Sequence, residues 1–354
     1  MSKVLDRVCQ VVEARRDEAI GLLRELVAQD SSVINQGERG NEGNVQPLVA
    51  QRLRDLGCEV DVFEPDNARL VKYTVDFNKG RNYEGRPNVV GVLKGKGGGR
   101  SLILNGRGGN GTLACVDRGY RADAAIITEG TGERVIVANR GVLNVEVVVS
   151  GSAAHAGRKW TGVSAIEKAV KIIQGLSELE RRWLATKSHP FLAAPTITVG
   201  QIEGGVGATV VPDSCTMKID VKFLPQDVDE ARSPNKVKRE FEDWAGLIAA
   251  GDDWMREHPP TVRWYSEVMP YEISPTHPFV VAMKAAAEEV IGEVPVAGAP
   301  GGSDARLMQN IGKVPTILFG TRGQSGHSAN ENVEIESYLR VIKALANMIV
   351  EWAC

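Results

Sequence analysis

The sequence predicts a layered α/β domain that is interrupted by a smaller α+β domain of the ferredoxin-like type. Over the first 140 residues, short apolar runs alternate with helical patterns, which is typical of a layered α/β sheet. A β-α-β-β-α-β order follows, and this order is the ferredoxin-like arrangement. After Pro270 the α/β pattern returns. We therefore predict an α/β domain made of 1–140 and 266–354, with an inserted α+β domain at 141–265.

Two amphipathic helices are predicted first. Apolar residues recur at helical spacing over 4–28, and a second such pattern over 41–56 stops at Gly57. Four β-rich runs come next, at 59–63, 88–94, 101–105 and 124–128. A helical stretch at 111–119 separates the last two runs, so together they predict a right-handed β-α-β unit.

The inserted domain is expected to begin with an alternating strand at 142–149. Ser164 and Glu167 form a capping-box pattern, because their side chains can reciprocally satisfy free amide groups, and a long helix should run from there to about Trp183. Strands at 196–202, 215–224 and 261–266 and a polar helix at 229–257 complete this domain. The rest of the chain predicts a helix at 278–291, a strand at 316–319 and a helix at 335–352.

Composition excludes several classes of protein. With 354 residues, 43% hydrophobic and 25% charged, the chain is of the ordinary soluble, globular kind. The 42 Lys and Arg residues against 45 Asp and Glu residues supply no basic surface for nucleic acid. No apolar run approaches a membrane span, and the amino terminus lacks the apolar core of a secretory signal. Five scattered cysteines without a Cys-x-x-Cys pair predict reduced thiols in a cytoplasmic protein.

Several separated motifs carry a family resemblance. They are Asn41-Glu42, Ile127-Thr-Glu-Gly130, Ala138-Asn-Arg-Gly141, Gly151-Ser-Ala-Ala-His-Ala-Gly157, Gly162-Val-Ser-Ala-Ile-Glu167, Gly204-Gly-Val-Gly-Ala-Thr-Val-Val-Pro-Asp213, Trp254-Met-Arg-Glu-His-Pro-Pro260, Gly301-Gly-Ser-Asp-Ala-Arg306 and Gly326-His-Ser-Ala-Asn-Glu331. Because these motifs occur together in this order, the chain resembles the dinuclear zinc amidohydrolases typified by acetylornithine deacetylase and succinyl-diaminopimelate desuccinylase. The resemblance implies hydrolysis of the amide of an N-acyl amino acid or related small molecule. It also implies a homodimer through the inserted domain and, in intact relatives, two zinc or cobalt ions per subunit.

The same resemblance assigns metal-binding and catalytic residues. Glu129 ends an apolar strand, where a carboxylate can project toward a ligand crevice, and it would bind one zinc ion. His327 lies in a Gly/Ser-rich loop, and its neutral imidazole would suit the other ion. His155 would stabilise the oxyanion of the tetrahedral intermediate, commonly in the partner subunit's site. Each of these side chains has a plain alternative as a solvated loop residue.

Substrate contacts are implied at Thr209 and in the segment 301–306. Gly301, Gly302 and Ser303 would form a flexible substrate loop, and the planar fork of Arg306 suits a carboxylate. An ordinary salt bridge is the alternative for Arg306. Thr209 stands where many relatives carry asparagine, so recognition of a substrate carboxylate is less certain from this motif.

One junction departs from the family pattern. Ser101-Leu-Ile-Leu-Asn-Gly106 resembles the strand that delivers the first metal ligands, yet it runs through Arg107 directly into Gly108-Gly-Asn-Gly-Thr-Leu-Ala114, which resembles the segment after the catalytic acidic pair. The bridging aspartate and the general base of the family are absent. Arginine has no lone pair for a metal, and catalytic zinc usually keeps three protein ligands. We expect at most one weakly bound ion, and exposed apolar surface or a gap in the sheet.

Two functions remain open from the sequence. One is a metal-dependent amidohydrolase, and the other is a catalytically inactive or deleted form that acts as a dimeric scaffold or small-molecule binder. A cysteine hydrolase based on Cys115 is a third reading. It is disfavoured because Cys115 lies in an apolar helical pattern and has no identifiable histidine partner.

Overall fold

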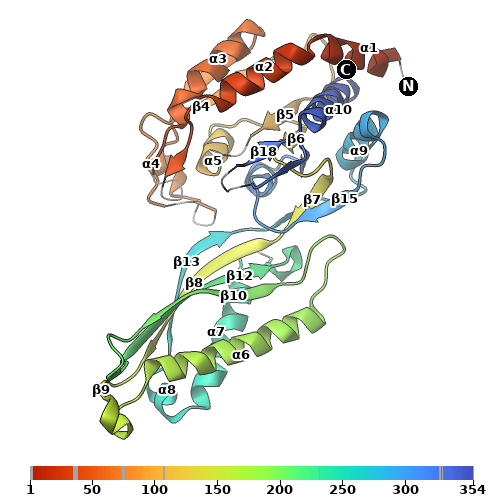
Figure 1. Cartoon of the computed structure of the whole chain (residues 1–354). Coiled ribbons are helices and arrows are strands. Elements are labelled where there is room, and N and C mark those ends of the chain that lie inside the picture. Colours follow the sequence, from red (N-terminus) through yellow and green to blue (C-terminus); the bar gives the residue numbers. More distant parts are fainter. Residues whose placement is uncertain are drawn as a thin grey trace. The chain divides into compact units, whose positions relative to one another are not determined.

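The computed structural model describes residues 3–34, 39–73, 76–77, 79–106, 108–230, 232–326, 328 and 330–353. The chain divides into two compact units (Figure 1). Unit 1 consists of Met1–Val137, Ile273–Ala297 and Ser303–Cys354, and unit 2 consists of Ala138–Glu272 and Gly298–Gly302. The predicted fold class, an α/β domain with an inserted α+β domain, is confirmed.

A sheet with the strand order β7-β16-β6-β5 forms the centre of unit 1. Its strands are β7 (Val135–Asn139), β16 (Thr316–Leu318), β6 (Ala124–Ile127) and β5 (Leu102–Asn105). β5, β6 and β16 are parallel, whereas β7 runs antiparallel to β16. β15 (Val296–Ala299) also pairs with β7, whose last two residues pair with β14 (Tyr271–Glu272) in unit 2. Every residue of β6 is fully buried, so the core of unit 1 lies around this strand.

The long helices of unit 1 agree with the expected pattern except at two breaks, whereas the short α4 and η5 were not predicted. Instead of one helix over 4–28 there are two, because Arg15 between them has non-helical backbone angles. The pattern at 41–56 starts as a 3₁₀ turn, and Pro47 then opens α3, as expected for a residue without an amide hydrogen. These elements are α1 (Lys3–Ala14), α2 (Arg16–Val27), η2 (Glu42–Asn44), α3 (Gln46–Asp55), α4 (Asn67–Leu70), α5 (Asn110–Asp117), α9 (Pro278–Ile291), η5 (Leu307–Ile311) and α10 (Ile335–Ala353).

β5, α5 and β6 form the predicted β-α-β unit, with Leu102 opposite Ala124 and Asn105 opposite Ile127. β5 is the outer strand of its sheet. β3 (Glu59–Phe63) and β4 (Asn88–Val92) pair with each other in a separate two-stranded sheet. The Leu104 side chain on β5 is 47% exposed, which agrees with the expected exposure of apolar surface at the junction. The remaining short strands of unit 1 are β1 (Val33–Ile34), β2 (Arg39–Gly40), β17 (Gly323–Gln324) and β18 (Asn332–Val333).

Unit 2 contains a four-stranded antiparallel sheet with the order β10-β12-β8-β13. The strands are β8 (Gly141–Ser150), β10 (Thr196–Gly204), β12 (Ser214–Phe223) and β13 (Thr261–Val268), in the predicted ferredoxin-like sequence with the helices. Figure 1 shows α6 (Ala165–Thr186) and α7 (Asn235–Ala250) on one face of this sheet. The Ser164 hydroxyl accepts a hydrogen bond from the Glu167 amide at 3.3 Å, so the predicted cap of α6 is present.

The polar stretch at 229–257 is not a single helix, as the sequence pattern had indicated. Asp252 ends the first helix and caps a second, α8 (Asp253–Glu257), by accepting hydrogen bonds from the amides of Trp254 and Met255. A buried aspartate in this position satisfies amide groups that a continuous helix would have used internally. The short elements β9 (Ala154–His155), η3 (Ala156–Thr161), β11 (Val210–Val211) and η4 (Pro225–Asp227) complete unit 2.

Candidate functional site

The carboxyl end of β5, where the resemblance places the first metal ligands, holds a buried hydrogen-bond network centred on Asp304. The Asp304 Oδ2 atom accepts hydrogen bonds from the Gly108 amide at 2.6 Å, the Gly109 amide at 2.8 Å and the Thr112 hydroxyl at 2.8 Å. Asn105, the last residue of β5, donates to the same hydroxyl at 3.1 Å. One of the two Asp304 carboxylate oxygens, Oδ2, is therefore fully engaged by protein donors.

Arg306 belongs to the same network. Its Nε atom donates to Asp76 Oδ1 at 2.7 Å, and its Nη1 atom donates to the Ser303 carbonyl at 2.7 Å. Nη1 also lies 3.6 Å from Asp304 Oδ1. Arg306 is 5% exposed, and Ser303 is equally inaccessible at 4%. The guanidinium thus forms the buried salt bridge that was its alternative reading, and the segment from Ser303 onward is packed into unit 1.

Glu129 lies just beyond β6, in a loop fixed to the one that follows β16. A side chain at Gly320 would come within 1.9 Å of the Glu129 carbonyl oxygen, so only glycine allows this approach. Glu133, buried and with a φ of 64°, binds Arg322 at 2.7 Å and Arg340 at 2.6 Å. These two ion pairs of Glu133 hold the backbone close to Glu129. Nothing in the sequence pattern had pointed to Glu133.

The implied dinuclear centre is not assembled by the described residues. His327 and Arg107 lie outside them, so the structure does not place the second predicted ligand. Among the residues that the structure describes, no group of three or more His, Cys, Asp or Glu side chains is arranged to hold a metal ion. At the end of β5 the available carboxylate already accepts three hydrogen bonds and faces a guanidinium. This donor set does not fit a divalent cation, because amide hydrogens and a guanidinium repel one.

The other predicted residues lie in unit 2. His155 is exposed, and its Nδ1 atom accepts a hydrogen bond from the Gly157 amide at 3.1 Å. Thr209 comes next to it, because the Thr209 carbonyl accepts from the Ala156 amide at 2.8 Å. The contact between these two motifs is therefore made by the backbone. Gly301 and Gly302 also belong to unit 2, whereas Ser303 and Arg306 belong to unit 1.

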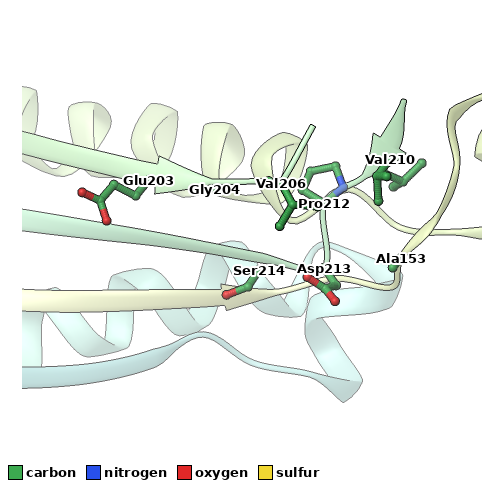
Figure 2. Close-up of a pocket in the computed structure, with 10 residues that line it drawn as sticks. Ala153, Glu203, Gly204, Val206, Val210, Pro212, Asp213 and Ser214 are labelled. Atoms are coloured by element: carbon green, nitrogen blue, oxygen red, sulfur yellow. The ribbon is translucent and has the colours of Figure 1, made fainter. Parts of the chain in front are cut away.

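Unit 2 has an open pocket of about 360 Å³ beside β11. Figure 2 shows its acidic side chains, Glu203 and Asp213, together with Ser214 and the apolar wall formed by Val206 and Val210. His155 pairs with Val210 across β9 and β11, but neither His155 nor Thr209 lines the pocket. The motifs Gly204–Asp213 and Gly151–Gly157 supply most of its lining, yet neither had predicted a pocket here.

Cys115 is unsuited to nucleophilic catalysis. It lies on α5, where the Asn88 side-chain amide contacts its sulfur at 3.6 Å. Burial raises the pKa of the Cys115 thiol to about 11, so almost none of it is thiolate at neutral pH. The structure therefore gives no support to the cysteine hydrolase.

Comparisons with known proteins identify the family. Residues 137–252 match the M20 model described as the peptidase dimerisation domain. An N-formyl-4-amino-5-aminomethyl-2-methylpyrimidine deformylase from Bacillus subtilis is 33% identical over 256 residues, which are 66% of this chain and 58% of that protein. This chain belongs to the M20 peptidase family, as its motifs indicated. It spans less than two thirds of the length of that relative.

Solved structures agree on the fold. The aminopeptidase PepT from Bacillus cereus superimposes with a TM-score of 0.68 at 19% identity, covering 95% of this chain and 98% of that one. An M20 family metallo-carboxypeptidase from Sulfolobus solfataricus gives a TM-score of 0.62 at 15% identity, covering 99% of both chains. No helix among the described residues has the length and apolar character that a membrane crossing requires.

Proposed function

We propose that this chain, with the residues it contains, is a non-catalytic M20 family member that acts as a dimeric scaffold or small-molecule binder. The observation that carries the proposal is the Asp304 network at the end of β5. In a hydrolase the end of β5 would have to contribute metal ligands, but here the Asp304 carboxylate that lies beside it binds Gly108, Gly109 and Thr112 through Oδ2.

A homodimer through unit 2 is the second part of this proposal. Most of the match to the dimerisation domain falls in this unit, and β10 is an outer strand of its sheet. Ile202 on β10 and Val206 just after it are 48% and 89% exposed. An outer strand with exposed apolar side chains is a template for pairing with another chain.

A metal-dependent amidohydrolase is the alternative, favoured by the identity to the B. subtilis deformylase. Its substrate would be the linear amide of a small N-acyl or N-formyl amine. Glu129 and His327 would then bind zinc or cobalt, and His155 would be the catalytic residue. Substrate contacts would come from Thr209, Gly301, Gly302, Ser303 and Arg306.

Turnover and mass distinguish the two proposals. The full chain, dialysed against zinc or cobalt, is tested for acetate release from N-acetylornithine and formate release from the formylated aminopyrimidine. We expect no release above a chelator-treated control, and a dimer by light scattering. Metal-dependent turnover that His327→Ala abolishes, while the control His258→Ala retains it, would establish the alternative. A strict monomer would overturn the dimer.

A further inference from the structure

The structure assigns Asp304 a positioning role in which a carboxylate, rather than a metal ion, holds the carboxyl end of β5. The inference concerns the folding of unit 1 and stands independently of the proposed dimer. Four parts of the chain meet at this side chain: the end of β5, the turn at Gly108 and Gly109, the first turn of α5 and the segment that starts at Ser303. Asp304 is only 4% exposed.

The local backbone is shaped to receive a carboxylate. Gly109 has a φ of 50°, a left-handed conformation that favours glycine, and it directs its amide toward Asp304 together with that of Gly108. Both amides belong to the start of α5, where the unpaired N–H groups and the helix dipole attract negative charge. A carboxylate accepts these donors without further cost, since it has acceptor sites only.

A relay extends the network to the strand. The Asn105 side-chain amide donates to the Thr112 hydroxyl, and this hydroxyl donates to Asp304 Oδ2. The hydroxyl is 3% exposed as part of Thr112, so water does not replace either bond readily. The last residue of β5 is thereby fixed to the first turn of α5 and to Asp304.

The two carboxylate oxygens of Asp304 face different positive groups: Oδ2 accepts hydrogen bonds, and Oδ1 lies in an ion-pair contact. Oδ2 receives three hydrogen bonds, and Oδ1 faces Arg306 Nη1 at 3.6 Å. Asparagine cannot reproduce this arrangement, because one of its two positions would present an NH₂ group either to the three donors or to the guanidinium. The surroundings of Asp304 therefore require a carboxylate, and an amide of the same size does not meet this requirement.

The buried negative charges of this network are balanced without a metal ion. Asp304 and Asp76 contribute two buried carboxylates, Arg306 one guanidinium, and the amino end of α5 supplies the remaining positive potential. Divalent metal added here would displace the guanidinium or meet amide hydrogens. Unit 1 should therefore fold equally well with and without metal.

Urea unfolding of the full chain tests this role, with Asp304→Asn compared with Asp66→Asn. Asp66 is an exposed cap of α4, and asparagine caps equally well. We expect Asp304→Asn to lower the folding equilibrium constant at least tenfold and to speed exchange of the Gly108 and Gly109 amides at least tenfold. Asp66→Asn should change both by less than twofold. Neither zinc nor EDTA should move the wild-type midpoint.

A second pair covers the case in which Asp304→Asn does not fold. Thr112→Val removes the hydroxyl from the relay, and Thr112→Ser restores it. We expect faster exchange of both glycine amides in the valine variant and recovery in the serine variant. Unchanged exchange in Thr112→Val or unchanged stability in Asp304→Asn would each overturn the inference. None of these outcomes bears on turnover or on the dimer, which the preceding experiment measures separately.

Discussion

Replacing Arg306 by methionine should destabilise unit 1 by about 3–5 kcal/mol, the usual cost of leaving a buried charge without its partner. The guanidinium is 5% exposed and holds Asp76 at 2.7 Å and the Ser303 carbonyl at 2.7 Å. Its removal leaves Asp76 and Asp304, each 4% exposed, without their shared cation. An exposed arginine that waits for a substrate carboxylate would cost at most about 1 kcal/mol. The size of the loss therefore separates the structural role from the substrate-binding one.

Urea unfolding followed by circular dichroism measures this loss. The matched control is Arg263→Met in unit 2, because the Arg263 side chain is 69% exposed and pairs with Glu146 at 2.8 Å. The control should lose less than about 1 kcal/mol. Adding Asp76→Asn to Arg306→Met should recover part of the loss, since the charge that faced the guanidinium is removed together with it and asparagine tolerates the positive φ of 70° at this position. A loss below about 1 kcal/mol in Arg306→Met alone would refute the buried-pair account.

Three further predictions concern other parts of the chain. Burial would raise the pKa of Asp252, but hydrogen bonds from Lys168 and Lys171 outweigh it and hold this pKa well below its ordinary value. The stabilisation is complete above the unfolded pKa of about 3.9 and is lost as pH falls through the folded pKa, so Asp252→Asn should destabilise unit 2 more at pH 7 than at pH 3 in urea titrations. Cys115 should react with iodoacetamide at pH 8 at least tenfold more slowly in the native chain than in urea, as measured by peptide mass mapping. Ser164→Ala should cost about 1 kcal/mol of stability, whereas Ser164→Asp should cost little, by thermal unfolding.

Local signals in the sequence predicted most of the fold. The helix predicted at 278–291 has these same bounds in the structure, and the capping box at Ser164 opens α6 where expected. Alternation of apolar residues located β8, and the sequence placed the other three strands of the unit 2 sheet as well. Two-residue strands such as β9 and β11 were missed, because so short a segment carries no periodicity. The five-residue strand β7, whose first four residues are apolar, was overlooked beside the motif that overlaps its end.

The site was harder to predict because its key contacts join residues far apart in the chain. Asp304 and Gly108 are separated by 196 positions, and Arg306 and Asp76 by 230. Motif resemblance identified Arg306 but gave no means of choosing between a substrate and Asp76. The glycine pair before α5 was visible in the sequence as a junction, yet only the fold shows which carboxylate binds its amides.

The number of zinc ions held by the chain tests the central claim most directly. It is measured by mass spectrometric metal analysis after equilibrium dialysis of the full chain against zinc. We predict at most one weakly bound ion, because Oδ2 of the Asp304 carboxylate already binds Gly108, Gly109 and Thr112 and Oδ1 faces the Arg306 guanidinium. Two tightly held ions per chain would contradict the account and would restore the hydrolase as the better proposal.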